Sequence, residues 1–517
     1  MQTLGSCSDS RSVGCWCCPP GPPPISSPAT VPPRITTLDP AAKEALRKTV
    51  RALRAELLDK LAAAARSEYR LDVAPDKAGL PEARRCKRER LDAWLDAEVA
   101  SSSDSSSSGG AGKAKPGKHA EAARQRAFDQ AVKEAASTLL NRLVLIRILE
   151  HHGALRPAVV TGGFKSPAYE QEFLHYAGPL AGDDTRGYAA LLDVVFAELA
   201  LDLPGLFGPV GLTPLFPIPA ASLRAVVDAL NDPALDSAWG DDTTLGWVYQ
   251  YWNDPEREAL DAKIAGGGKI EPHEIASKTQ MFTERYMVEW LLQNSLGLSW
   301  LCICKKNGWT PRADSILGLL DERRRDFRVR REAGSVTPDA LLPISPGLEH
   351  AWKYYVPQPI PQDAVDKAPA SIRDLKLLDP ACGSGHFLVI AFDLLAEMYR
   401  EEAAHRGEAW SDAQIAESIL ANNLHGIDID PRAIQIAAAG LWLKAKLFAP
   451  EAQLSRLNLV APGFRLGALP KDDPALVKLA DELAALNVPK KLTQGLVDSL
   501  SGVDHLGSLL RVGDEIQ

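Results

Sequence analysis

The sequence lacks any run of apolar residues long enough to cross a bilayer, and its N-terminus lacks the basic-then-apolar order of a secretory signal. These two absences predict a soluble, cytoplasmic protein with no membrane partner. An excess of positive charge is also missing, because 58 Lys and Arg residues face 67 Asp and Glu residues, for a net charge of −9. Any contact with DNA must therefore come from a local groove or from a segment outside this sequence.

Regularly spaced cysteines are missing as well. Of the eight cysteines, four crowd the first 18 residues. A structural zinc site needs paired cysteines with a second pair downstream, and Cys15-Trp16-Cys17-Cys18 does not offer that spacing. The remaining cysteines are scattered, as in a reduced cytosolic protein. The sequence therefore predicts no metal site.

The 517 residues, 45% of them hydrophobic, suffice for two or three domains. Residues 1–38 are rich in Pro, Ser and Cys and are predicted to form a disordered tail. A helical N-terminal domain is predicted over 39–268, opened by the helix cap Asp39-Pro40 and interrupted by a flexible Ser/Gly-rich linker at 101–118. Its predicted helices are 41–66, 119–152, 187–202, 219–231 and 246–252.

The region 269–517 has a different pattern. It begins with helical sequence, including a helix at 284–294, and continues through a Pro-rich connector at 337–361. Short strands then alternate with helices, which predicts a parallel, doubly wound sheet and an α/β fold class. The predicted strands are 375–378, 424–429 and 457–460, and the predicted helices are 387–402, 411–422 and 431–448.

The first chemistry-bearing segment is LDPACGSGHFL at 378–388. Gly383 and Gly385 let the backbone turn tightly and approach a ligand, and the helix that follows presents unpaired N–H groups. A lone Gly-x-Gly is weak evidence for a ligand-binding turn. The whole segment between a predicted strand and a predicted helix is much more specific evidence. The adjacent His386 is expected to be a packing or capping residue rather than a base.

The second segment is GIDIDP at 426–431. A carboxylate at the end of the second strand can accept two hydrogen bonds from a ribose diol. Asp430, directly before Pro431, suits a helix cap, so Asp428 is predicted to hold the ribose. The interval from Asp379 to Asp428 exceeds the spacing of about 20 residues in dinucleotide-binding folds, which argues against a plain NAD site.

Both segments resemble motifs I and II of the amino-methyltransferases that act on DNA, and the upstream segment 280–288 resembles motif X. The order X, I, II is that of the gamma class, used by adenine-N6 enzymes. Over roughly 120–515 the chain further resembles the BREX phage-defence methyltransferases of the PglX type, and type IIG restriction-modification enzymes share the core. The segments that carry this likeness are 135–153, 245–253, 282–297 and 424–445.

The resemblance implies a Rossmann-like methyltransferase domain, S-adenosyl-L-methionine as the cofactor and double-stranded DNA as the substrate. Other phage-defence proteins are implied as possible partners. Phe282 and Thr283 would flank the methionine moiety, and Asp428 would hold the ribose. The residues implied to line the rest of the cofactor pocket are Asp379, Ala381, Gly383 and Gly385.

Two features depart from the family. The Asn-Pro-Pro-Tyr motif that binds the flipped adenine is absent, since neither Asn231-Asp232-Pro233 nor Asn487-Val488-Pro489 matches it. The motif III region at 457–464 also lacks its acid. No catalytic residue is therefore assigned. The expectation is a C-terminally truncated methyltransferase with an incomplete sheet, which binds cofactor weakly or not at all and does not turn over alone.

Two alternatives stay open. A type IIG restriction-modification fragment would need a Pro-Asp…Asp/Glu-x-Lys nuclease set, and no convincing one is present. A non-catalytic cofactor-binding subunit would take the missing motif from a partner chain. The one basic cluster, at 323–331, is expected to be a solvated helix face more readily than a surface for DNA phosphates.

Overall fold

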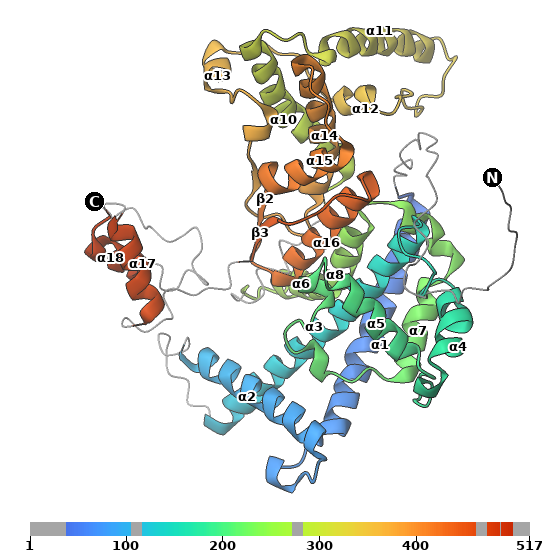
Figure 1. Ribbon diagram of the computed structural model, residues 1–517, viewed down its shortest axis with the longest axis vertical. Helices are drawn as coiled ribbons and strands as arrows, with labels where there is room; N and C mark the ends of the chain where they lie inside the picture. Colours follow the sequence, from blue (N-terminus) through green and yellow to red (C-terminus); the bar gives the residue numbers. More distant parts are fainter. Residues whose placement is uncertain (1–37, 105–115, 271–282, 462–472, 486–487, 500–517) are drawn as a thin grey trace, which may run out of the picture. The chain divides into compact units, whose positions relative to one another are not determined.

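The computed structural model describes five stretches of the chain (Figure 1), namely residues 38–104, 116–270, 283–461, 473–485 and 488–499. All of them belong to the single unit Thr36–Gln517. Three predicted features lie outside the described residues: the disordered tail up to residue 37, the Cys15–Cys18 cluster within it, and Phe282.

The first helix, α1 (Pro40–Tyr69), begins as predicted. The Asp39 carboxylate accepts a hydrogen bond from the backbone N–H of Ala42 at 2.8 Å, and Pro40 fills the first helical position, where no N–H is needed. Residues three or four positions apart form one apolar face. The buried residues of that face include Leu46, Val50, Leu53, Leu57 and Leu61.

Helix α2 (Glu82–Asp104) has no counterpart among the predicted helices. It enters the segment predicted as a flexible linker, 101–118, and α3 (Pro116–His151) takes the last residues of that segment. Helices therefore extend into both ends of the predicted linker, and 105–115 lie outside the described residues. Charged residues dominate α2, and within its described part only Arg88, Leu91 and Leu95 are buried, so its hydrophobic periodicity is weak.

Helix α8 (Thr244–Ala265) closes the helical region and packs against α1 and α3. It continues beyond the predicted end at 252 and runs through Pro255, whose missing N–H removes one backbone hydrogen bond. Burial of its first three turns offsets this loss. The other helices of this region are α4 (Leu174–Tyr176), α5 (Tyr188–Leu199), α6 (Pro204–Phe207) and α7 (Ala220–Leu230), with short 3-10 or π turns at Pro75–Lys77, Gly163–Lys165, Ala168–Phe173, Gly178–Leu180, Thr213–Leu215 and Pro233–Gly240.

Three strands form a parallel sheet in the order β1-β2-β3. They are β1 (Leu377–Asp379), β2 (Leu424–Ile427) and β3 (Asn458–Val460), each close to a predicted strand. Helices precede, connect and follow them, so the predicted α/β class is confirmed at this coarse level. These helices are α10 (Arg285–Asn307), α11 (Arg312–Glu332), α12 (Leu348–Trp352), α13 (Gln362–Lys367), α14 (His386–Arg406), α15 (Asp412–Ser418), α16 (Pro431–Phe448), α17 (Pro474–Ala485) and α18 (Lys490–Ser499), with short turns of helix at Ile372–Asp374 and Ile419–Asn423.

One face of this sheet packs against helices. A Cβ atom added at Gly426 of β2 would lie 2.7 Å from the side chain of Leu459, 2.9 Å from the Cys382 sulfur and 3.0 Å from the side chain of Leu388 on α14, so any larger residue would displace this packing. The register places Leu378, Ile427 and Val460 on the opposite face. These side chains are 56%, 37% and 53% exposed within the described part of the chain. Parallel sheets are ordinarily covered on both faces, so this face differs from the rule.

Helix α16 belongs to both hydrophobic cores of the protein. Ile436 and Trp442 join the core formed by the helical region, whereas Leu441 and Ala445 join the core between the sheet, α10 and α14. Contacts of α16 with α3 and α8 on one side and with α14 on the other agree with this position (Figure 1). The two regions are therefore built on one shared helix.

Candidate functional site

The glycine turn between β1 and α14 takes the shape that the sequence predicts. Gly383 and Gly385 have φ angles of 53° and 79°, in the left-handed region that favours glycine. A Cβ at Gly385 would come within 2.8 Å of the Ala437 Cβ on α16, whereas a Cβ at Gly383 would meet nothing within 4 Å. Gly385 is therefore needed for helix packing, and Gly383 leaves its backbone facing open space.

Asp428 lies directly against this turn. One carboxylate oxygen accepts a hydrogen bond from the Gly383 backbone N–H at 2.8 Å, and the other accepts one from the Asp430 backbone N–H, also at 2.8 Å. The Asp428 N–H donates to the Val460 carbonyl at 3.1 Å. Each carboxylate oxygen retains a further lone pair, so the oriented group can accept two more hydrogen bonds.

Asp379 and Ala381 stand at the start of the same turn. The backbone N–H of Ala381, an exposed residue, donates to the Asp379 carboxylate at 3.2 Å. Burial raises the pKa of Asp379, and the negative charge of Asp428 adds to this effect. Burial also raises the pKa of the Cys382 thiol to about 12, so this cysteine is a packing residue rather than a nucleophile. The turn thus brings two carboxylates together beside an exposed backbone.

Asp430 has the capping role predicted for it. Its carboxylate accepts a hydrogen bond from the Arg432 backbone N–H at 2.9 Å and begins α16. The Arg432 guanidinium and the Tyr249 hydroxyl also donate to it, at 2.8 Å and 2.9 Å. Burial alone would raise the pKa of Asp430, but the charge and hydrogen bonds of Arg432 outweigh burial and lower it. Asp430 is therefore engaged in the fold, whereas the Asp428 carboxylate accepts its hydrogen bonds from two backbone N–H groups.

Thr283, the described residue of the predicted motif X pair, lies at the entrance to α14. Its backbone lies beside the ring of His386, the first residue of that helix. His386 is 7% exposed, and burial lowers its pKa to about 3, so the imidazole is neutral at physiological pH. This agrees with the predicted packing role. The fold thus brings Thr283, the glycine turn and Asp428 to one end of the sheet.

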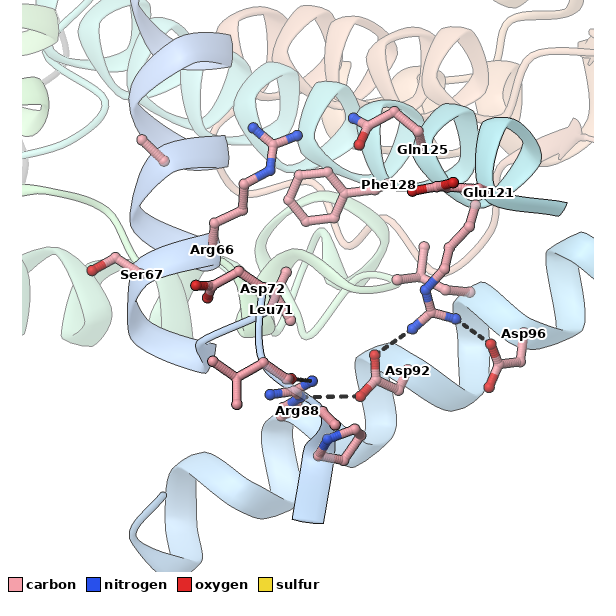
Figure 2. A pocket seen from close by; sticks show the side chains of 16 residues that line it. Arg66, Ser67, Leu71, Asp72, Arg88, Asp92, Asp96, Glu121, Gln125 and Phe128 are labelled. Carbon is pink, nitrogen blue, oxygen red and sulfur yellow. Dashed lines mark hydrogen bonds and ion pairs between the residues drawn. The ribbon is translucent and has the colours of Figure 1, made fainter. Parts of the chain in front are cut away.

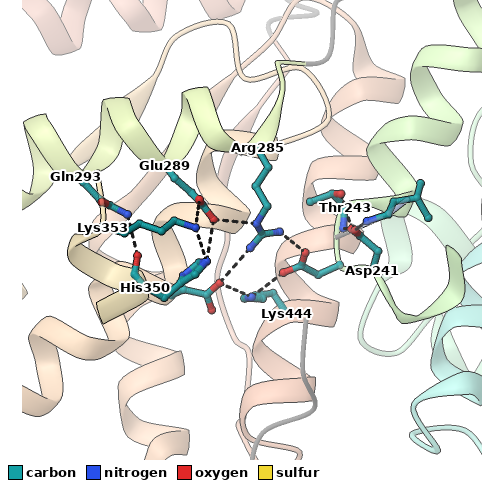
Figure 3. Close-up of polar contacts among 11 residues, drawn as sticks. Asp241, Thr243, Arg285, Glu289, Gln293, His350, Lys353 and Lys444 are labelled. Carbon is teal, nitrogen blue, oxygen red and sulfur yellow. Dashed lines mark hydrogen bonds and ion pairs between the residues drawn. The ribbon is translucent and has the colours of Figure 1, made fainter. Parts of the chain in front are cut away.

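A largely buried cluster of charges, which includes Arg285 and Lys444, lies close to His386 (Figure 3). Arg285, two residues after Thr283, donates to Asp242 at 2.9 Å and to Glu289 at 3.1 Å. Lys444 of α16 donates to Asp242 and to Asp393, both at 2.7 Å. The cluster joins the start of α8 to α10, α14 and α16.

The cluster extends toward α12. Lys353 pairs with Glu289 at 2.8 Å, and His350 lies 3.4 Å from the same carboxylate. Burial alone would raise the pKa of Asp242, but Lys444 and Arg285 outweigh it and lower the pKa. Sequence reasoning missed these residues, because their pairing depends on contacts between distant segments.

A cleft with a volume of about 820 Å³ lies between α1, α2 and α3 (Figure 2). Two of its three arginines already have polar partners: Arg88 donates to the carbonyls of Tyr69 and Val73, and Arg124 pairs with Asp92 and Asp96. The third, Arg66, lies over the ring of Phe128. None of the residues predicted for the cofactor lines this cleft.

The arginine cluster on α11 is partly structural. Arg323 pairs with Glu349, Arg324 donates to the Lys353 carbonyl, and Arg331 donates to the Ala340 carbonyl. Within the described ranges, no helix is long and apolar enough to cross a membrane. No group of three or more metal-ligating side chains occurs among the described residues either.

Comparisons with known proteins relate this chain to DNA methyltransferases. The family model "MmeI, DNA-methyltransferase domain" matches residues 361–460, which include the glycine turn and Asp428. The adenine-specific methyltransferase BrxX of Escherichia coli O9:H4 (strain HS) is 26% identical over 349 residues, covering 63% of this chain and 25% of that protein. The adenine-specific methyltransferase PglX of Lacticaseibacillus casei (strain Zhang) is 26% identical over 352 residues, covering 62% and 26%.

A third relative is the putative type II restriction enzyme and methyltransferase RM.MjaORFECS2P of Methanocaldococcus jannaschii, 39% identical over 69 residues, which are 13% of this chain and 6% of that protein. The predicted resemblance to BREX methyltransferases of the PglX type is confirmed. The chain spans about a quarter of the length of BrxX and PglX.

Proposed function

We propose that this chain carries the S-adenosyl-L-methionine-binding part of a DNA adenine-N6 methyltransferase that serves phage defence or restriction-modification. The observation that carries the proposal is the hydrogen bond from Gly383 to Asp428, which joins the glycine turn to the acid after β2. It lies inside the segment matched by the methyltransferase family model. The parallel order β1-β2-β3 supports a Rossmann-like sheet, in which ligands bind at the carboxyl ends of the strands.

The residues present fit the cofactor. Asp428, already oriented by two backbone amides, would accept the hydrogen bonds of the ribose diol. Ile429, 69% exposed beside it, offers an apolar surface to the purine. The exposed backbone at Gly383 would allow close approach of the nucleoside.

The methionine end would lie between Thr283 and the two carboxylates of the turn. Asp379 and Asp428 repel each other, and a positively charged ligand group would relieve that repulsion. Bound S-adenosyl-L-methionine would supply such a charge, together with the methyl group that the sulfonium makes electrophilic. Phe282, the partner of Thr283 in the predicted motif, is proposed to flank the same end.

The proposal assigns cofactor binding to this chain and no catalytic residue. The Asn-Pro-Pro-Tyr motif that would bind the target adenine is absent from the sequence. Of the two outcomes expected from the sequence, weak binding and no binding, we propose weak binding, because the glycine turn and Asp428 are assembled. The binding should be weak since the apolar sheet face of Leu378, Ile427 and Val460 is exposed in the described part of the chain. Double-stranded DNA is proposed as the substrate of the whole enzyme.

Saturation-transfer NMR with S-adenosylhomocysteine on the purified chain, followed by calorimetric titration, tests the proposal. We expect weak binding by the wild-type chain and a loss of about ten-fold or more in affinity for Asp428→Ala, because the ribose loses a charged acceptor. Asp59→Ala, on the exposed surface of α1, is the matched control and should bind like the wild type. Absence of binding by the wild type, or equal binding by Asp428→Ala, would refute the proposal.

A further inference from the structure

The hydroxyl of Tyr249 links the helical region to the predicted ribose loop. Resting on the proposed cofactor-binding function, we propose that Tyr249 of α8 is a positioning residue that sets the orientation of the Asp428 carboxylate. Tyr249 belongs to the helical region and would not itself touch the ligand. The inference assigns a role in cofactor binding to a segment well upstream of the glycine turn.

The contact is direct and buried. The Tyr249 hydroxyl donates to the Asp430 carboxylate at 2.9 Å, and the two residues, 181 positions apart in the sequence, are both 8% exposed. The Arg432 guanidinium donates to the same carboxylate oxygen at 2.8 Å. In such a low-dielectric site, a hydrogen bond to a charged acceptor is strong and directional.

Asp430 passes this restraint to Asp428. The backbone N–H of Asp430 donates to one Asp428 oxygen at 2.8 Å, while the Asp430 side chain caps α16. The other Asp428 oxygen is held by the N–H of Gly383. A continuous series of hydrogen bonds therefore runs from Tyr249 through Asp430 and Asp428 to the glycine turn.

The start of α8 is fixed independently of Tyr249. Asp242, just before the helix, accepts hydrogen bonds from Lys444 at 2.7 Å and from Arg285 at 2.9 Å. Because these ion pairs of Asp242 remain when the Tyr249 hydroxyl is removed, Tyr249→Phe should fold with α8 in place. The variant therefore removes one hydrogen bond rather than the packing of the helix.

A matched control lies on the same helix. Tyr251 is also buried, at 5% exposed, and its ring stacks on Trp247 with centroids 5.7 Å apart. Among the described residues its hydroxyl has no hydrogen-bond partner. Tyr251→Phe therefore removes a buried phenol of the same helix without touching the Asp430–Asp428 series.

The test compares S-adenosylhomocysteine with its 2′,3′-dideoxy analogue, which lacks the diol, by calorimetric or NMR titration. The wild-type chain and Tyr251→Phe should prefer the diol-bearing ligand. In Tyr249→Phe this preference should fall on the order of five- to ten-fold, because a loosened Asp428 accepts the diol less well. Affinity for the dideoxy analogue and the melting temperature should change little. Asp430→Asn, which keeps a capping side chain without the charge, should also reduce the preference.

The outcomes separate the two proposals. If the wild-type chain binds neither ligand, the proposed function fails and this inference fails with it. If the wild type prefers the diol and Tyr249→Phe keeps the full preference, only the role of Tyr249 is refuted. A loss of affinity for both ligands in equal proportion would show a structural role and would also refute positioning.

Discussion

The carboxylate of Asp428 accepts a hydrogen bond of 2.8 Å from the backbone N–H of Gly383, 45 positions earlier in the sequence. Parallel pairing of β1 with β2 brings the two residues together. Asp379 and Gly426 are partners in the register, so both strands end at the same edge of the sheet. A local turn and a distant acid thus become one unit. The predictions below follow from this unit and from the packing that supports it.

The two glycines of the turn should differ in their tolerance of alanine. Gly385→Ala should lower the free energy of unfolding by roughly 2–4 kcal/mol, because a positive φ is combined with a clash against Ala437. Gly383→Ala should cost only about 1 kcal/mol, since its Cβ would enter open space. Urea unfolding of both variants provides the measurement. Equal losses for the two would contradict the packing role of Gly385.

His386 should make stability depend on pH. Its folded pKa of about 3 lies below the usual value of 6.5, because burial, aided by the positive charges of Arg285 and Lys43, outweighs the opposing effect of Asp242. Neutral His386 stabilises the fold fully above pH 6.5, and this contribution is lost as the pH falls from 6.5 toward 3. As the pH falls through that window, the free energy of unfolding of the wild type should decrease by about 1.4 kcal/mol per pH unit relative to that of the His386→Gln variant. Denaturant unfolding of both proteins at pH 7.5 and 5.5 measures this difference. An equal change in the free energy of unfolding for the wild type and the variant would contradict the prediction.

The buried charge cluster should be far more sensitive than surface ion pairs. Asp242→Ala removes the buried carboxylate that Lys444 and Arg285 share, leaving Lys444 only Asp393 and Arg285 mainly Glu289, and should cost on the order of 3 kcal/mol. Arg51→Ala, which removes the exposed pair with Glu258, should cost less than about 1 kcal/mol. Chemical denaturation of the two variants compares them. A small loss for Asp242→Ala would mean that water solvates the cluster.

The cap of α1 gives a local test of the sequence prediction. Asp39→Ala removes the acceptor for the Ala42 N–H and should destabilise the fold by about 1 kcal/mol. Asp39→Ser keeps a capping oxygen and should recover most of this loss. The midpoint of thermal unfolding, measured for the wild type and both variants, shows how much stability the cap contributes. Equal midpoints for the alanine and serine variants would show that the cap contributes little.

Features that depend on a short stretch of sequence were predictable. The cap at Asp39, the turn at Gly383 and Gly385, and the helix at 431–448 all depend on residues within a few positions of one another, and the structure contains each of them. Asp430 was separated from Asp428 by the same local reasoning, since only Asp430 directly precedes Pro431.

Features that depend on contacts between distant segments were not predictable. Helix α2 has a weak apolar pattern, and α8 continues through Pro255 because its flanks are buried by α1 and α3. The pairing of Asp242 with Lys444 joins residues 202 positions apart, so no spacing rule could indicate it. For Tyr249 the only signal was its place in the segment 245–253, which resembles the PglX-type enzymes.

Helix α16 has a consequence for how the protein loses its structure. Ile436 and Trp442 face the core of the helical region, whereas Leu441 and Ala445 face the core beside the sheet. Unfolding of either region would therefore expose a hydrophobic side of α16. The helical region and the sheet should therefore denature together in one cooperative transition. A fragment that begins at residue 269 would leave Ile436 and Trp442 bare to water and should aggregate rather than remain a monomer.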